Sequence, residues 1–376
     1  MLKEVGMKIL VTGAKGFVGR NLTAELRNRK YEEIYEYDID TDPSELDRFV
    51  KDCDFVFHLA GVNRPKDESE FMTGNFGFTD TLLKKLKENG NKAPVLITSS
   101  IQAELDNPYG KSKKAGEELM FSYSEETGAP VYVYRLPNVF GKWCRPNYNS
   151  AVATFCNNIA AGLPIRVNDA SVVMNLVYID DVVSEFINAL EGRANIVGRY
   201  GAVPTVHTTT LGHIVEIIKS FKESRKKLEL PRLDDALESK LYSTYLSYLP
   251  KDDLAYPLKM NIDERGSFTE FIRTPDRGQV SVNISHPGIT KGNHWHHSKN
   301  EKFLVVKGRG CISFRKYGTE EIIDYHVSGD ELTVVDIPTG YTHCITNEGD
   351  EDMVTVMWAN EAFDPDRPDT YYEPVR

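Results

Sequence analysis

A tyrosine and a lysine four residues apart are the first side chains in this sequence whose spacing could carry out chemistry. On a helix, Tyr109 and Lys113 would share one face. A phenol with a pKa of about 10 is a poor acid–base group at neutral pH, but a nearby ammonium lowers that pKa. Ser99 or Ser100, at the end of an apolar run, could orient a substrate oxygen. We interpret the trio as a site that moves a hydride and a proton together; the alternative is an exposed pair on an amphipathic helix.

Three glycines spaced three residues apart directly follow a short apolar run: Gly13, Gly16 and Gly19. In a strand–turn–helix unit, the first glycine allows a tight turn and the second lets a pyrophosphate approach the backbone. The third lets the helix pack closely on the sheet. The helix that begins near Phe17 and Val18 would point its N-terminus at the phosphates. The spacing predicts a dinucleotide-binding turn.

Two residues near this turn bear on the choice of cofactor. Asp38 ends the second predicted strand, where an acid would bind the ribose 2′-OH of NAD. Lys15 lies inside the glycine loop and could instead pair with the 2′-phosphate of NADP, unless it is simply a solvated loop lysine. Taken alone, these residues fit either cofactor.

A second set of chemistry-bearing residues lies near the C-terminus. Alternate residues of a strand face the same side, so His294 and His296 could both point into a barrel and His297 outward. Glu301 and His343, on adjoining strands, would complete a set of three nitrogens and one carboxylate suited to zinc or another divalent transition metal. The alternative is a group of imidazoles on a polar barrel face without a metal.

The two sets fall in segments with different periodicity. Residues 7–190 alternate strand-like and helix-like runs, which predicts right-handed βαβ units and an α/β doubly wound parallel sheet. From Phe268 onward, short strands separated by glycine-rich turns are typical of an antiparallel barrel or sandwich. We place the domain boundary in the linker 249–253, which gives domains 1–250 and 251–376.

Composition excludes several classes of function. The chain has 376 residues, more than one ordinary domain, and a net charge of −11 without a basic stripe, which argues against nucleic-acid binding. Its five cysteines are widely spaced and predict a reducing compartment. The first residues lack a signal-peptide pattern, and no run approaches the about 18 apolar residues of a membrane span. We therefore expect a cytoplasmic protein without membrane insertion.

The glycine turn and the Ser–Tyr–Lys trio resemble the extended short-chain dehydrogenase/reductase superfamily over about residues 7–245. Further segments that carry the resemblance are His58–Asn63, Arg135–Gly141 and Leu176–Asp181. The resemblance implies a Rossmann-like fold with Ser100, Tyr109 and Lys113 as catalytic residues, because Ser100 matches the family's catalytic hydroxyl better than Ser99. It implies additional cofactor contacts from Leu59, Ala60 and Asn75, and a sugar-nucleotide contact from Asn138. Lys142 and Arg166 are further candidates for pairing with the substrate pyrophosphate.

The C-terminal segments His294–Glu301 and Pro338–Asn347 resemble the paired cupin motifs, which implies an all-β cupin barrel over about residues 255–376. Asp263–Glu270 together with Lys291–His294 is also similar to the sugar-nucleotide 3,5-epimerases of the cupin class. In those enzymes the histidine at the His294 position is a base that removes a proton alpha to a ketone. Metal ligation would then fall to His296, Glu301 and His343, so both roles of His294 stay open.

Three segments, 140–149, 241–250 and 291–297, are similar almost residue for residue to the bifunctional capsular-polysaccharide synthesis enzymes of the CapF type, and the resemblance extends over the whole chain. The resemblance implies a homodimer that acts on a UDP-linked 4-keto-6-deoxy amino sugar, with C3 epimerisation in the cupin and NADPH-dependent C4 reduction in the first domain. The product would be UDP-N-acetyl-6-deoxy-L-talosamine, on the path to UDP-N-acetyl-L-fucosamine. Because the ketone acidifies the C3 proton and reduction removes that ketone, epimerisation must come first.

Two other classes of function are open at this point. A single-activity reductase would use the cupin only as a dimerisation module with a structural metal. A nucleotide-sensing protein would need a broken catalytic trio, and Ser100, Tyr109 and Lys113 are all present.

Overall fold

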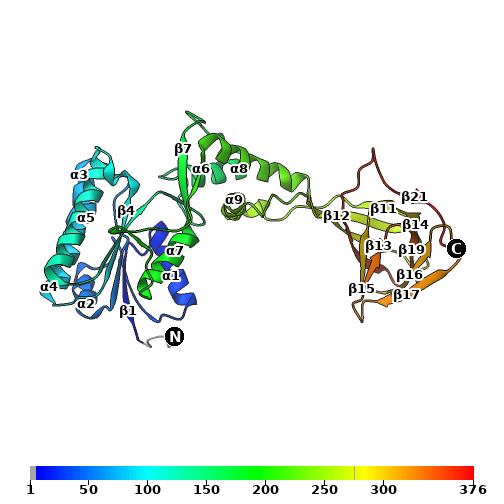
Figure 1. Ribbon diagram of the computed structural model, residues 1–376, viewed down its shortest axis with the longest axis horizontal. Helices are drawn as coiled ribbons and strands as arrows, with labels where there is room; N and C mark the ends of the chain where they lie inside the picture. Colours follow the sequence, from blue (N-terminus) through cyan, green and yellow to red (C-terminus); the bar gives the residue numbers. More distant parts are fainter. Residues whose placement is uncertain (1–5, 275) are drawn as a thin grey trace. The chain divides into compact units, whose positions relative to one another are not determined.

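A seven-stranded sheet of order β2-β1-β3-β4-β5-β9-β8 forms the centre of the first half of the computed structural model, which describes residues 6–274 and 276–376 (Figure 1). Its strands are β1 (Lys8–Thr12), β2 (Glu33–Tyr37), β3 (Phe55–His58), β4 (Val95–Ser100), β5 (Val131–Leu136), β8 (Ile196–Val197) and β9 (Tyr200–Gly201). Strands β1 to β5 pair in parallel, which confirms the predicted doubly wound sheet. All four residues of β3 are buried, as expected for a strand covered on both faces.

Helices cover both faces of this sheet. Helices α1 (Phe17–Asn28) and α7 (Ile179–Leu190) pack on one face, and α2 (Pro43–Asp52), α4 (Phe78–Glu88) and α5 (Pro108–Thr127) on the other (Figure 1). The winding reverses between β1 and β3, which lie side by side. Ligands of such sheets bind in the crevice at the carboxyl ends of the strands at this reversal. The glycine turn after β1 lies at that crevice.

Smaller elements complete the first half. A three-stranded sheet has the order β10-β7-β6. Its strands are β6 (Asn138–Phe140), β7 (Val173–Tyr178) and β10 (His207–Thr210). The remaining helices are α3 (Ser69–Phe71), the π-helix η1 (Met72–Gly77), the 3₁₀ helix η2 (Ile101–Glu104), α6 (Ala151–Ala160), α8 (Leu211–Lys226) and α9 (Ala236–Leu246). The 3₁₀ helix η3 (Lys251–Asp253) begins the second half. None of the described helices is long and apolar enough to cross a bilayer.

The second half consists of two antiparallel sheets, which confirms the predicted all-β region. The six-stranded sheet has the order β11-β12-β13-β20-β15-β18, with bounds β11 (Asn261–Asp263), β12 (Gly266–Thr274), β13 (Gly278–Ser285), β15 (Glu301–Lys307), β18 (Val334–Ile337) and β20 (Met353–Ala359). The five-stranded sheet has the order β17-β16-β19-β14-β21, with bounds β14 (Thr290–Trp295), β16 (Arg309–Lys316), β17 (Ile322–Ser328), β19 (Tyr341–Asn347) and β21 (Tyr371–Tyr372). Apolar side chains from both sheets form one core.

The chain divides into two units, and the division differs from the predicted boundary in one segment. Unit 1 comprises the residues up to 219 and 235–250, and unit 2 comprises 220–234 and 251–376. The sequence prediction placed 220–234 in the first domain. These residues instead join unit 2 because Leu230 N–H donates to the Arg273 carbonyl at 2.9 Å and Arg273 N–H to that of Leu228 at 2.8 Å. Backbone pairing of this kind leaves no periodic signal in the sequence.

Candidate active site and metal centre

The glycine turn after β1 is shaped for a close backbone approach. Gly13 has φ +69°, and a Cβ there would lie 2.7 Å from the Ala60 nitrogen. A Cβ on Gly19 would collide with the Gly13 carbonyl, so helix α1 can approach the turn only without a side chain. Gly16 occupies the N-cap of α1 and provides no side-chain cap, which leaves the helix N-terminus open to an anion. Phe17 is the first residue of that helix.

The two residues that bear on the cofactor contact one another. One Asp38 carboxylate oxygen accepts from Lys15 N–H at 2.7 Å, and the other accepts from Ile39 N–H at 2.8 Å. The Lys15 ammonium pairs with Asp40, and both of these side chains are exposed. Asp38 therefore holds the glycine loop against the end of β2, a structural role that its position in the sequence did not reveal.

The structure brings Ser100, Tyr109 and Lys113 together. Ser100 ends β4, and Tyr109 and Lys113 lie one turn apart near the start of α5. The N-cap Asn107 accepts from Gly110 N–H at 2.7 Å and fixes this start. The Lys113 ammonium lies 5.8 Å from the centre of the Tyr109 ring and donates to the Thr98 carbonyl at 3.3 Å.

The two candidate serines have different partners. Ser99 is buried and donates to Glu117 at 2.5 Å, and the same carboxylate accepts from Arg135 at 2.7 and 2.9 Å. Ser100 accepts from Gln102 N–H at 3.2 Å, and its hydroxyl interacts with the Tyr109 phenol. Ser99 therefore belongs to a buried ion-pair network, while Ser100 faces the tyrosine.

Burial controls the ionisation of the pair on α5. It raises the pKa of Tyr109, and the hydrogen bond from Ser100 only partly opposes that increase. Burial also lowers the pKa of Lys113 to about 8, although the negative charge of Glu117 acts to raise it. The pKa of Tyr109 was expected to be lowered, but in this structure it is raised, because loss of hydration is the largest cause of its shift. A phenol that stays protonated is suited to donate a proton.

A polar framework surrounds this pair. The Asn75 side chain, on the π-helix η1, accepts from Val62 N–H at 2.8 Å and donates to Ser112 at 3.0 Å. A Cβ on Gly61 would lie 2.8 Å from Asn75 Oδ1 and 3.0 Å from Lys113 Nζ, so these side chains converge on the turn after β3. Leu59 and Ala60 form the start of that turn, where Leu59 N–H donates to the Thr12 carbonyl at 3.1 Å.

His58 is a buried residue of this framework for which the sequence analysis predicted no role. Its two ring nitrogens contact the hydroxyls of Thr12 at 2.7 Å and Thr79 at 2.8 Å. Burial, helped by the charge of Lys113, lowers the pKa of His58 to about 3, so the ring is neutral. It ties β1 to α4 beneath the catalytic pair. The sequence feature that could have indicated this role is a histidine at the end of an otherwise apolar strand.

The predicted substrate contacts are less closely grouped. Asn138 is exposed at the start of β6 and donates to the Asn175 carbonyl at 3.3 Å. Lys142 follows β6 and pairs with Asp180. Arg166 is exposed in the segment between α6 and β7. Their roles stay predictions.

Four side chains of unit 2 converge as predicted for a metal centre. One donor atom from each of His294, His296, Glu301 and His343 lies within 4.8 Å of all the others. Glu301 Oε2 is 3.4 Å from His296 Nε2 and 3.2 Å from His343 Nε2. These three atoms are buried without a hydrogen-bond partner. Such atoms are rare in folded proteins, and their convergence fits a divalent cation held by nitrogen and carboxylate ligands.

The strand arrangement differs from the prediction in one respect. His294 on β14 is paired directly with His343 on β19, but Glu301 begins β15 in the other sheet. The expected adjoining strands thus supply only the histidines, and the carboxylate reaches them across the space between the sheets. His297 is exposed, as the alternation predicted.

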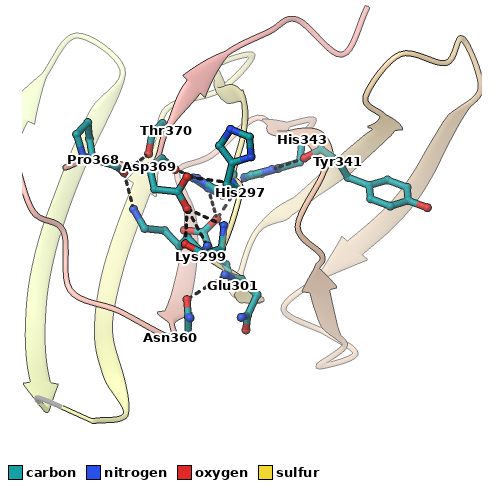
Figure 2. Close-up of polar contacts among 12 residues, drawn as sticks. His297, Lys299, Glu301, Tyr341, His343, Asn360, Pro368, Asp369 and Thr370 are labelled. Carbon is teal, nitrogen blue, oxygen red and sulfur yellow. Dashed lines mark hydrogen bonds and ion pairs between the residues drawn. The ribbon is translucent and has the colours of Figure 1, made fainter.

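A cavity of about 490 Å³ opens beside this cluster. His294, Glu301 and His343 line it, together with Lys291 and Arg265. Burial, assisted by the neighbouring imidazoles, lowers the pKa of His294 to about 4, so its ring is neutral. Tyr341 does not line the cavity, and its ring points away from His343 (Figure 2). The neutral ring of His294 and the cationic side chains of Lys291 and Arg265 therefore line the same cavity.

Comparison with known proteins also separates the chain into an N-terminal and a C-terminal part. Residues 9–200 match the NAD dependent epimerase/dehydratase family, and residues 261–371 match the polysaccharide biosynthesis C-terminal domain. The first match covers more than half of the chain, which therefore belongs to the NAD dependent epimerase/dehydratase family. A UDP-glucuronic acid 4-epimerase from Bacillus cereus, 21% identical with a TM-score of 0.55 over 64% of this chain and 98% of that one, shares the fold of part of the chain.

Two relatives extend over nearly the whole chain. A UDP-2-acetamido-2,6-beta-L-arabino-hexul-4-ose reductase from Pseudomonas aeruginosa is 47% identical and covers 97% of this chain and 98% of its own. The capsular polysaccharide assembling protein CapF from Staphylococcus aureus is 57% identical, with a TM-score of 0.93 over 98% of this chain and 100% of its own. Within its family the chain is therefore of the CapF type. These relatives support a sugar-nucleotide reductase or epimerase role with a nicotinamide cofactor.

The different partners of Ser99 and Ser100 lead to a first prediction. Ser100→Ala should slow hydride transfer about 100-fold or more, because the hydroxyl beside Tyr109 is lost. Ser99→Ala should leave the rate within a few-fold but lower stability by about 1–3 kcal/mol, because a buried carboxylate loses a hydrogen bond. Single-turnover oxidation of the reduced cofactor and calorimetric unfolding measure the two effects. A greater loss of rate in Ser99→Ala would reverse the assignment.

The lowered pKa of Lys113 leads to a second prediction. The ammonium is charged below pH 8 and becomes neutral as the pH rises through its pKa of about 8. Hydride transfer measured in single turnovers should therefore fall above pH 8. Lys113→Arg should lack this fall in whatever activity it keeps, since arginine stays charged. Lys111→Ala, which changes an exposed lysine of the same helix, is the control and should keep the wild-type profile.

The metal centre leads to a third prediction. Zinc-reconstituted wild-type protein should contain one metal per chain, and His296→Ala and His343→Ala should each lose it, because their buried Nε2 atoms face the Glu301 carboxylate. Loss of the metal in His294→Ala as well would make His294 the fourth ligand. His297→Ala is the matched control and should retain the metal. Elemental analysis after desalting gives the stoichiometry. Full retention in His294→Ala would instead assign His294 as a catalytic base.

Proposed function

We propose that the chain is a bifunctional sugar-nucleotide enzyme that epimerises C3 of a UDP-2-acetamido-2,6-dideoxy-hexos-4-ulose in a cupin-type unit and then reduces C4 in unit 1. The observation that carries this proposal is that one chain holds two separate sites with complementary chemistry. In the first site the protonated phenol of Tyr109 lies near the ammonium of Lys113. In the second, a neutral imidazole, the candidate metal ligands and cationic side chains surround one cavity. The likeness to the two full-length relatives supports it.

In unit 1, each residue of the trio has a role in reducing the ketone. A bound nicotinamide supplies the hydride. The Ser100 hydroxyl orients the C4 oxygen, and the Tyr109 phenol, protonated because burial raises its pKa, donates a proton to that oxygen as it gains negative charge. The Lys113 ammonium stabilises the tyrosinate left behind. The glycine turn, with Val18 in the first turn of α1, holds the pyrophosphate.

We propose NADPH as the reductant. Both carboxylate oxygens of Asp38 accept backbone amides, so this acid has a structural role in the loop that is independent of the ribose. The exposed ion pair of Lys15 with Asp40 is of a kind worth little, about 0–1 kcal/mol, so the ammonium can turn to a 2′-phosphate.

In unit 2, the cavity residues fit removal of a proton alpha to the ketone. The C3 proton is acidic only while the negative charge on the C4 oxygen is stabilised. A divalent cation held by His296, Glu301 and His343, with or without His294, would supply a Lewis acid. The Lys291 ammonium, fixed by Asn283 at 2.9 Å and the Ile284 carbonyl at 2.7 Å, adds positive charge to the cavity wall.

Exchange of the C3 hydrogen with solvent is the test. In D₂O without reductant, wild-type protein given the 4-keto substrate should incorporate deuterium at C3, observed by NMR. Tyr109→Phe should keep this exchange and lose reduction, while His343→Ala should lose exchange. Added NADPH should be oxidised faster than added NADH. Reductant consumption by wild-type protein without any C3 exchange would favour the alternative, a single-activity reductase with a structural, dimerising cupin.

A further inference from the structure

The C-terminal tail lies directly against the strand that carries the metal-centre histidines. Strand β21 pairs with β14, placing Tyr372 opposite His294 and Tyr371 opposite Trp295. Glu373 N–H then donates to the Asn293 carbonyl at 3.0 Å. The tail thus completes the edge of the five-stranded sheet, although about 70 residues separate it from β14 in sequence.

Asp369, just before β21, makes two different sets of contacts (Figure 2). Its backbone carbonyl accepts from His296 Nδ1 at 2.5 Å. Its carboxylate accepts from three consecutive backbone N–H groups, those of His297 at 3.0 Å, Ser298 at 2.9 Å and Lys299 at 2.9 Å, and from the Ser298 hydroxyl at 3.0 Å. One residue therefore fixes both the ring of His296 and the turn that follows it.

The carbonyl contact determines which nitrogen of His296 is protonated. A carbonyl oxygen only accepts hydrogen bonds, so Nδ1 must carry a proton, and Nε2 is then the nitrogen that can offer a lone pair to a cation. Nε2 is the buried atom without a hydrogen-bond partner, and it faces Glu301 at 3.4 Å. This is the protonation state that a metal ligand needs, and an acceptor on the second nitrogen is the usual way of imposing it.

The backbone of Asp369 is held in an unfavourable conformation. Its φ is +38°, in the left-handed region that non-glycine residues rarely adopt, although aspartate tolerates it better than most. The same residue that makes the carbonyl contact with His296 is held in this conformation by the contacts of its carboxylate. Lys299 reinforces the arrangement by donating from Nζ to the Pro368 carbonyl at 2.9 Å.

We propose that Asp369 is a positioning residue of the metal centre: through its carboxylate it holds the 297–299 turn, and through its carbonyl it sets the orientation and tautomer of His296. The C-terminal tail must then be docked before the centre binds its cation tightly. This inference rests on the proposed metal-dependent function of unit 2 and concerns affinity for the cation, separate from the chemistry that follows.

Zinc affinity of the apoprotein tests the proposal, measured by competition with a chromophoric chelator. Asp369→Gly removes the carboxylate while relieving the backbone strain, and should weaken binding about 10–100-fold, as expected for loss of an outer partner of a ligand. Asp369→Asn keeps one acceptor oxygen and should fall between Asp369→Gly and wild type. Asp366→Ala, an exposed aspartate of the same tail, is the matched control and should bind like wild type.

Two further measurements make each outcome decisive. The unfolding profile reports whether unit 2 of a variant is folded, and cofactor binding reports on unit 1. Histidine ¹⁵N NMR of wild-type apoprotein should show His296 protonated at Nδ1. A folded Asp369→Gly variant that binds zinc within threefold of wild type, or a wild-type His296 protonated at Nε2, would overturn the proposal. Absence of zinc binding by wild-type protein would instead contradict the metal centre itself.

Discussion

Three polar atoms buried without a hydrogen-bond partner are the constraint on which unit 2 depends: Nε2 of His296, Oε2 of Glu301 and Nε2 of His343. Burying such an atom without a partner destabilises the folded state by about 1–3 kcal/mol. The three atoms lie where side chains of the two sheets meet. Glu301 belongs to β15 of one sheet, and the imidazoles come from the other side. A cation at this point would satisfy all three atoms and link the sheets, so we expect metal binding to stabilise the folded unit 2.

In unit 1 the equivalent constraint is the reversal of winding between β1 and β3. The turns after these two strands approach so closely that no Cβ fits at Gly13. His58 links β1 to α4 through its contacts with Thr12 and Thr79, and Tyr109 and Lys113 lie on α5. Burial in this packing sets the ionisation of the candidate pair, because it raises the pKa of Tyr109 and lowers that of Lys113.

The sequence allowed prediction of those features that depend on local spacing. The distance of four residues between Tyr109 and Lys113 follows from the geometry of one helix, and the alternation of His294 and His296 from a strand that ends one residue before His296. Features that depend on tertiary packing were missed or wrong. The pKa of Tyr109 follows burial rather than its neighbour, and Glu301 comes from the opposite sheet. Asp369 acts through a backbone carbonyl, for which no residue type is a signal.

The order of the two proposed reactions explains why joining both sites in one chain is useful. The epimerised ketone can return to its original configuration for as long as its C3 proton remains acidic. Reduction at C4 ends that acidity and makes the new configuration permanent. The residues predicted for the two sites are divided between the units, since every residue assigned to the trio lies in unit 1 and every predicted ligand in unit 2. Covalent linkage would keep the two proposed activities at equal concentration, so that an epimerised ketone always has a reductase available.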